Sequence, residues 1–418
     1  MPATAAQVFG PVTVNPLLNA TGVKTLLTMN TSLPPGGKNI VIAVLMPNAA
    51  FSEGASGRHT LRITKTTVLY ETPIGMLINY GGQRTKPIML MAIDDVPAGN
   101  DTYTFEINTT AAGSSTGLVH VQGMVIKADA DAQWTYNTTA VSVSSGGTAT
   151  VVTLSTNYPA GTKVVALAYV LGQPNTTTGG QYNVGAGNVK VKLNGTVVSS
   201  NQFNYGGSAN VYPLHTNLCF GTTLSTSTQT WAVEFTNGSS VAFNVYAILV
   251  VFTVTDLAFL DTASVALSNG VQVTVGDLTT SLQGDVAVIA IASAENASTT
   301  SATAFNANDV VLQLNNSATG QISNLVSWLF GSTGGHDRSG NLPLFRFDTG
   351  VTNPSYQIKM TARANGINGE AKIVAFSTVT VEEKTVTDSI SLLDAASVSR
   401  SFVVSDSFSL TEAYSSEG

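Results

Sequence analysis

The sequence predicts an all-β protein made of three tandem β-sandwich, jelly-roll-like domains followed by a strand-like C-terminal tail. Three observations predict this fold. One layout of residues recurs about every 120–130 positions, which is the length of a whole domain. Apolar and polar residues alternate in short runs with turn signals about every ten residues, as in sandwiches. Helical periodicity is almost absent, and only Ser323–Phe330 is expected to hold a turn of helix.

Each third of the chain opens with a short alternating stretch, a glycine-bearing turn and a dense aliphatic run. These openings are Leu27–Leu45, Val152–Val170 and Val273–Ser293. Each third closes with an alternating strand, a polar hairpin turn and a long apolar strand. These closing segments are Tyr103–Asp129, Trp231–Asp256 and Tyr356–Glu382. The repeat predicts sandwiches at 8–133, 134–256 and 257–385, an N-terminal extension at 1–7 and a tail at 386–418.

The middle third shows the expected strands most clearly. Its predicted strands are Ala140–Ser144, Thr148–Leu154, Lys163–Leu171, Asn188–Leu193, Thr196–Ser200, Val211–Phe220, Thr230–Thr236 and Val241–Thr253. Asn-Gly pairs at Asn194 and Asn237 are strong hairpin signals. Eight strands suit a jelly roll or an immunoglobulin-like sandwich. The Cys…Trp…Cys pattern of immunoglobulin domains is missing, which favours the jelly roll.

The C-terminal tail has a repeat of its own. Asp388–Ala395 recurs as Asp406–Ala413, and both copies alternate polar and apolar residues. Two short strands do not make a stable domain. The tail is therefore expected either to stay solvated or to donate a strand to the sheet edge of a neighbouring subunit. The apolar residues that would carry such an assembly contact are Ile390, Leu392, Phe408 and Leu410.

Composition excludes several classes of function. Charged residues are 10% of the chain, the net charge is -7, and no Lys/Arg cluster exists that could follow a phosphate backbone, so no nucleic-acid partner is expected. The longest apolar run, Val245–Val254, is about half a membrane span, and the start of the chain has no secretory-signal pattern. The sequence thus predicts no membrane span. With so few carboxylates, folding stability is expected to depend weakly on pH.

No constellation of catalytic or cofactor-binding residues stands out. Gly113–Gly117 matches G-x-S-x-G, but that motif needs a helix after it, and Leu118–Lys127 has the pattern of a strand. We therefore expect no enzyme activity and no cofactor. No zinc spacing occurs, and the only metal candidates worth naming are Asp129 and Asp131, as weak calcium ligands at the first domain junction.

Single residues of potential interest have structural explanations. His120 and His215 fall within strands and are expected to be core or interface side chains, and the lone Cys219 a small buried one. Tyr103, Trp231 and Tyr356 hold equivalent places in the three copies, which favours packing over a sugar platform. Three turn-located sequons are natural glycosylation acceptors if the protein is exposed to a glycosylating host: Asn175, Asn194 and Asn237.

In overall plan, Val8–Glu383 resembles the turret and spike proteins of turreted icosahedral archaeal viruses, which stack jelly rolls outward from the capsid vertex. The Asp-Ser-x-Ser-Leu tail is similar to repeats in archaeal surface proteins. The resemblance implies a structural protein of the virion surface: a turret, spike or capsid-associated decoration. It also implies homo-oligomers, contact with other capsid proteins, attachment at one end and host contact at the other.

Two alternatives from other classes use the same features. An archaeal cell-surface filament or S-layer-type subunit would be extracellular and joined by strand exchange with other surface-layer proteins. A carbohydrate-binding adhesin would bind host glycans through exposed aromatic residues on one sandwich face or in the insertion loops.

Overall fold

The computed structural model divides the chain into two compact units, Met1–Thr380 and Val381–Gly418. All the described residues lie in the first unit. They are residues 2–16, 19–48, 52–53, 58–75, 86–111, 115–128, 132–175, 181–203, 205–208, 214–297, 302–330 and 339–378. The predicted tail, with Ile390, Leu392, Phe408 and Leu410, lies outside them.

The first sandwich has two four-stranded antiparallel sheets. Its inner sheet has the order β1 (Ala5–Val14), β10 (Val119–Ala128), β3 (Lys38–Pro47), β7 (Ile88–Asp94). Its outer sheet has the order β2 (Gly22–Asn30), β8 (Thr102–Ala111), β5 (Arg58–Thr64), β6 (Val68–Glu71). A small third sheet pairs β4 (Ser52–Glu53) with β9 (Ser115–Thr116).

The second sandwich repeats this order. Its inner sheet runs from β11 (Gln133–Tyr136) and β12 (Val141–Val143), which both pair with β21 (Phe243–Val254), to β14 (Lys163–Pro174) and β19 (Leu214–Thr223). Its outer sheet is β13 (Thr148–Thr156), β20 (Gln229–Thr236), β16 (Val189–Leu193), β17 (Thr196–Ser200). The small sheet is β15 (Gln181–Val184) with β18 (Tyr205–Ser208).

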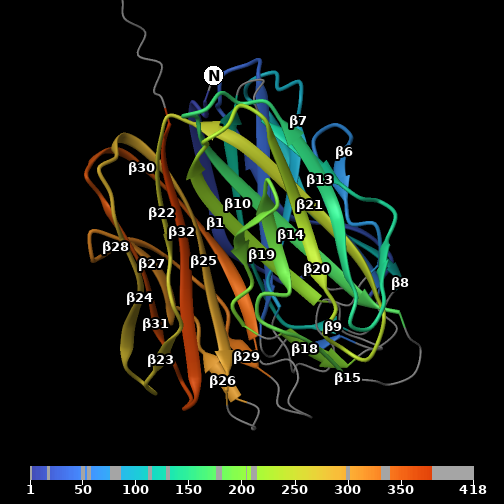
Figure 1. Cartoon of the computed structure of the whole chain (residues 1–418). Helices are drawn as coiled ribbons and strands as arrows, with labels where there is room; N and C mark the ends of the chain where they lie inside the picture. Colours follow the sequence, from blue (N-terminus) through green and yellow to red (C-terminus); the bar gives the residue numbers. More distant parts are fainter. Residues whose placement is uncertain are drawn as a thin grey trace, which may run out of the picture. The chain divides into compact units, whose positions relative to one another are not determined.

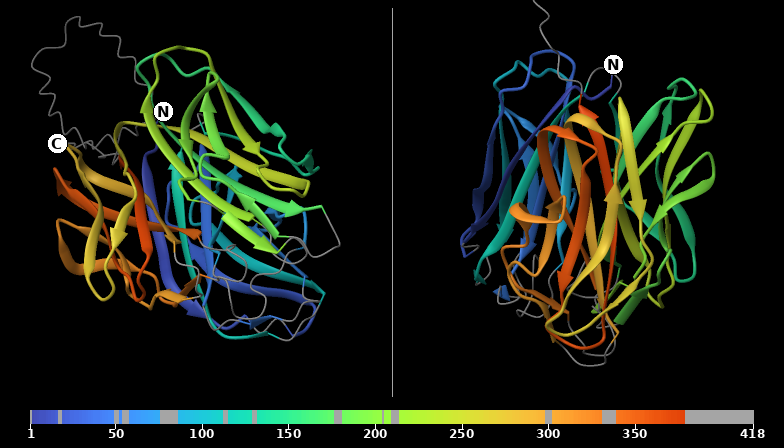
Figure 2. Two further views of the ribbon diagram at one scale, coloured as in Figure 1. Left: turned by 60° about the horizontal axis from the view of Figure 1, so that its bottom comes forward. Right: turned by 90° about the vertical axis from the view of Figure 1, so that its left-hand side faces the viewer.

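The third sandwich repeats it again (Figures 1 and 2). Its inner sheet runs from β22 (Asp256–Asp261) and β23 (Val265–Leu267), which both pair with β32 (Ile367–Thr378), to β25 (Gln283–Asn296) and β30 (Ser339–Thr352). Its outer sheet is β24 (Gln272–Thr279), β31 (Ser355–Thr361), β27 (Val310–Leu314), β28 (Ser317–Ser323). The small sheet is β26 (Ala302–Phe305) with β29 (Trp328–Phe330).

The predicted fold class is confirmed, because every regular element among the described residues is a strand and the strands form successive sandwiches. The helical turn expected in Ser323–Phe330 is wrong. Asn324 explains why: its Oδ1 accepts from Val310 N at 2.8 Å, and its Nδ2 donates to the carbonyls of Asn306 and Val326 at 2.8 Å. These bonds hold the connection to β29 in an extended form that leaves no helical ladder.

All eight strands predicted in the middle third are present, with ends displaced by up to three residues. Three shorter strands were missed: β11, β15 and β18. The predicted extension at 1–7 needs a correction, since Ala5–Gln7 belong to β1 and Ala5 pairs with Lys127 of β10. Ala3 is buried as well, and its N–H donates to Thr253 O of the second sandwich at 2.9 Å.

The dense aliphatic runs become the central strands of the inner sheets. β3, β10, β25 and β32 are buried along most of their length on both faces, whereas outer strands such as β8 alternate buried and exposed residues. A strand covered on both faces reads as a continuous hydrophobic run. One face of each inner sheet packs on its own outer sheet. The other face meets the neighbouring sandwiches, and we call the region where these second faces meet the shared core.

Candidate assembly site

The three sandwiches contact one another in a cyclic order. Edge strand β7 of the first packs on β14 and β19 of the second. Edge strand β19 of the second packs on β22, β25 and β32 of the third, and β30 of the third packs on β1 and β10 of the first. Each contact joins the edge strand of one inner sheet to the inner sheet of the next, and the third contact returns to the first sandwich. Heterologous contacts that close in this way are those of a ring.

One end of the shared core is apolar. Counting two residues back from the ends of β10, β21 and β32 gives Ile126, Phe252 and Phe376, all 0% exposed. The rings of Phe252 and Phe376 meet edge to face across the second and third sandwiches, with centroids 5.6 Å apart. Edge-to-face pairs of this kind stabilise beyond the area that they bury.

A glycine of the second sandwich faces a leucine side chain of the third. A Cβ added at Gly221 of β19 would lie 2.9 Å from Leu257 Cδ1 of β22. Beside it, the rings of Phe220 and Phe259 meet edge to face with centroids 5.2 Å apart. The absence of a side chain at Gly221 therefore lets the third sandwich seat its first strand against β19.

The opposite end of the shared core is polar. Eight residues before the ends of the same three strands stand His120, Tyr246 and Glu370, with exposures of 0%, 9% and 1%. Buried polar groups normally need a partner, and burying a charge costs still more. This end therefore places three different titratable side chains at one repeated position.

Asn217 joins all three sandwiches. From β19 its Oδ1 accepts from Met89 N of the first sandwich at 3.1 Å, and its Nδ2 donates to Pro87 O at 3.2 Å. The same Nδ2 donates to Asn341 Oδ1 of the third sandwich at 2.8 Å, and Asn341 Nδ2 returns a bond to Asn217 O at 2.8 Å. Both asparagines are buried. A satisfied buried network of this kind fixes one arrangement of the groups it joins.

A second amide joins the first and third sandwiches. Gln122 of β10 is 0% exposed, and its Nε2 donates to Phe345 O at 2.8 Å. Its Oε1 accepts from Phe345 N at 3.1 Å. The side chain thus satisfies both backbone groups of one residue of β30, as a neighbouring strand would.

Both strand histidines lie in the shared core, as expected. His215 is stacked on Tyr169, whose hydroxyl lies 2.8 Å from His215 Nδ1. Burial, with a smaller effect of Lys86, lowers the pKa of His215 to about 3. Burial likewise lowers the pKa of His120 to about 4, while its Nδ1 accepts from Leu325 N of the third sandwich at 3.2 Å. Both rings are therefore neutral in the folded protein at ordinary pH.

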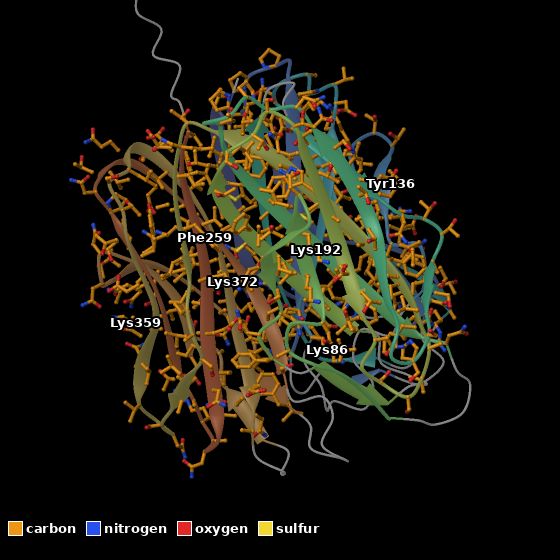
Figure 3. All side chains as sticks on the ribbon, viewed as in Figure 1. Lys86, Tyr136, Lys192, Phe259, Lys359 and Lys372 are labelled. Atoms are coloured by element: carbon orange, nitrogen blue, oxygen red, sulfur yellow. The ribbon has the colours of Figure 1, made fainter. Side chains whose placement is uncertain are left out.

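Glu370 and Lys372 lie on the face of β32 that meets the second sandwich (Lys372 is labelled in Figure 3). Gly369 and Ala371, which alternate with them along the strand, lie on the opposite face. A Cβ on Gly369 would lie 2.8 Å from Met360 Sδ of the outer sheet. Lys372 is paired with Asp261 at 2.5 Å. Burial raises the pKa of Glu370 to about 8, although Lys372 and Ser293 act to lower it.

The sequence did not identify this core, yet it contained a signal. Polar residues interrupt otherwise apolar runs at His120 and Gln122 in the first copy and at Glu370 and Lys372 in the third. Each pair falls at the same distance from the end of its strand. In a run buried on both faces, such interruptions indicate polar contacts rather than a solvent face.

The predicted site residues are spread out. Asp129 and Asp131 lie outside the described residues. Asn175 and Asn194 are exposed. Asn237 is 0% exposed, and its Nδ2 donates to the carbonyls of Val143, Ser144 and Val241, so its amide is occupied inside the turn.

The equivalent aromatic residues Tyr103, Trp231 and Tyr356 are each 0% exposed, which confirms the packing role expected of them. A different aromatic cluster bridges the first and second sandwiches. Tyr136 of β11 lies 4.7 Å from Trp134 and 5.1 Å from Tyr70 of β6, measured between ring centroids, and Tyr136 is 40% exposed. Among the residues described, this cluster comes closest to the exposed aromatic surface that a sugar-binding site would need.

Within the described ranges, no three His, Cys, Asp or Glu side chains come together in a way that could hold a metal ion. The same ranges contain no helix able to cross a membrane. Cys219 is a free, buried thiol on the shared-core side of β19.

The first unit has two distinct ends along its strands. β1 begins, and β10, β21 and β32 finish, at the apolar end of the shared core. The opposite end carries the small sheets, and Figure 1 shows β9, β15, β18, β26 and β29 away from the N-terminus.

No protein-family model and no curated protein matches the chain. Among solved structures, the major capsid protein of Sulfolobus turreted icosahedral virus is similar at 8% identity and TM-score 0.28, over 61% of this chain and 99% of that one. A structure of the triple jelly roll fold and turret assembly of an archaeal virus is similar at 14% identity and TM-score 0.19, over 90% and 91%. PNGF-II is similar at 12% identity and TM-score 0.25, over 59% and 65%.

The resemblance to archaeal-virus turret proteins that the sequence predicted is thus found again among solved structures. Identities and TM-scores this low do not superpose the strands residue by residue.

Proposed function

We propose that the chain is a structural protein of a virion surface: a turret, spike or capsid decoration. It forms homo-oligomers, binds other capsid proteins and contacts the host. The observation that carries this proposal is the cyclic packing of three sandwiches around one core. Burial of all three inner sheets gives a rigid block, while surface and loops are left for contacts. Rigid scaffolds with variable end loops are the usual basis of recognition surfaces.

The two ends of the block support a division of labour. β1 begins and β32 ends at the apolar end of the shared core, and in this proposal that end serves for attachment. The opposite end, which carries the three small sheets, is then left for host contact. In this proposal the alternating residues Ile390, Leu392, Phe408 and Leu410 supply the assembly contact, as an added strand at a neighbouring sheet edge.

Electron microscopy of the purified full chain tests the proposal, together with a variant that lacks Asp388–Gly418. Closed rings or vertex-like clusters support a turret or spike. Threads that disappear with the tail would instead support a cell-surface filament or S-layer-type subunit. A full chain that stays monomeric at high concentration, alone and with the capsid proteins of its source, contradicts both.

A carbohydrate-binding adhesin remains the second candidate because Tyr136 presents an exposed ring in a cluster of three aromatic residues. Glycan-array binding that is lost in Tyr136→Ala and kept in Tyr103→Phe would favour it. We also propose that Asn175 and Asn194 accept glycans in a glycosylating host, which intact-mass measurement of native material tests.

A further inference from the structure

We propose that the contact between the second and third sandwiches is an acid-closed seam, in which Glu370 must keep its proton for β32 to stay packed against β19. As the pH rises toward neutrality the seam loosens. This inference goes beyond the proposed function, because it holds for any role in which these sandwiches stay packed.

The geometry leaves Glu370 without solvent and without a partner for a charge. The side chain is 1% exposed, and neither carboxyl oxygen makes a hydrogen bond of normal geometry to the described residues. Ser293 stands directly opposite on β25, and its hydroxyl acts to lower the pKa of Glu370. A neutral carboxyl tolerates such a place far better than a carboxylate does.

The charges around Glu370 are already balanced. On its own strand Lys372 is paired with Asp261 of β22 at 2.5 Å, which engages the cation that would otherwise favour ionisation of Glu370. β25 contributes a second acid, Glu295, whose charge disfavours ionisation of Glu370. β19 contributes Cys219, whose pKa burial raises to about 12, and β21 contributes Tyr246, whose pKa burial also raises. Ionised Glu370 would therefore be an uncompensated buried negative charge.

The direction with pH follows from linkage. The pKa of Glu370 is about 8 in the packed seam and near 4.5 when the side chain is solvated. Below about pH 4.5 both states carry the proton and the seam has its full stability. Between about 4.5 and 8 only the packed state keeps the proton, so opening becomes up to about tenfold easier for each pH unit. Above about 8 no further loss is expected.

Cys219 gives a built-in reporter for this seam, because it is the single cysteine of the chain, is buried, and lies on β19 near Glu370. The experiment measures the rate at which dithiodipyridine labels Cys219 in the full-length protein between pH 5 and 7, well below the melting temperature. The matched variant is Glu370→Gln, which keeps the shape and removes the charge. The ratio of the wild-type rate to the variant rate cancels the reactivity of the thiol itself and the titration of His120 and His215.

The proposal expects this ratio to rise about 100-fold from pH 5 to 7, at up to about tenfold per pH unit. Glu295→Gln removes only the smallest of the effects that raise the pKa of Glu370, so this variant should keep most of the rise. A ratio that stays constant with pH overturns the proposal. The proposal is also overturned if the labelling rate of Glu370→Gln rises with pH as the wild-type rate does, while that of Glu295→Gln does not. If Glu370→Gln misfolds, the rise in the wild-type labelling rate relative to that of unfolded protein decides, and a rise equal to that of unfolded protein overturns the proposal.

Discussion

The apolar and polar ends of the shared core use the same strands in different ways. At the apolar end, the repeated position holds three buried hydrophobic residues of the same chemical kind: Ile126, Phe252 and Phe376. At the polar end, it holds His120, Tyr246 and Glu370, which differ in chemical kind. Apolar contact is non-directional and scales with area, whereas buried polar groups accept few partners.

The two ends together give three similar copies one arrangement. The apolar end supplies most of the stabilisation but would tolerate several rotations of one sandwich against another. The polar end distinguishes the copies, because Asn217 finds its partners only with the backbone of Pro87–Met89 on one side and with Asn341 on the other. We hypothesise that the apolar end stabilises the packing of the sandwiches and that the polar end selects one arrangement of them. Substitutions at each end test this hypothesis.

The largest effect is expected at the apolar end. Phe376→Ala removes a fully buried ring that packs on Phe252 and leaves a cavity between the second and third sandwiches. We expect a loss of about 3–5 kcal/mol in the free energy of unfolding, measured by urea denaturation. The control is Tyr136→Ala, an aromatic deletion at a residue 40% exposed, which should cost clearly less. Equal losses in the free energy of unfolding for the two variants would contradict the stabilising role of the apolar end.

The next effect tests the polar junction. Asn217→Ala leaves the N–H of Met89 and the carbonyl of Pro87 buried without their side-chain partner, while Asn341 keeps its bonds to the backbone of residue 217. We expect a loss of about 3 kcal/mol, since each buried unsatisfied group costs about 1–3 kcal/mol. Thr223→Ala, on an exposed position of the same strand, should cost under about 0.5 kcal/mol. If Asn217→Ala is as mild as its control, the junction does not fix the arrangement.

A smaller effect concerns acid. The pKa of His215 is about 3 in the folded chain, below the usual 6.5, because the ring is buried. The unfolded chain takes up a proton below about pH 6.5 and the folded chain does not, so stability falls as the pH falls. Between pH 6.5 and 5, His215 should account for a loss of about 2 kcal/mol, which His215→Gln should remove. Parallel profiles of unfolding free energy for the wild type and the variant would contradict this.

The outer half of the fold was predictable from sequence and the shared core was not. Strands such as β20 alternate and are bounded by Asn-Gly turns, so periodicity finds them. Periodicity cannot say what covers the second face of β10 or β19, because partners of that face lie more than a hundred residues away. The weak pH dependence expected from the low content of carboxylates stays a prediction. The buried His215 and Glu370 act in opposite directions, the first lowering stability as the pH falls and the second as it rises.

The smallest effect should come from the rim of the same seam, which separates buried from exposed polar contacts. Lys163 and Asp256 form an ion pair of 2.5 Å between the second and third sandwiches, with side chains 35% and 54% exposed. Exposed pairs gain little because water and salt screen them. Asp256→Asn should therefore cost under about 1 kcal/mol, and the cost should shrink further in high salt, measured by urea denaturation at two ionic strengths. A cost as large as that of Asn217→Ala would mean that rim charge, rather than the buried amide junction, fixes how these sandwiches meet.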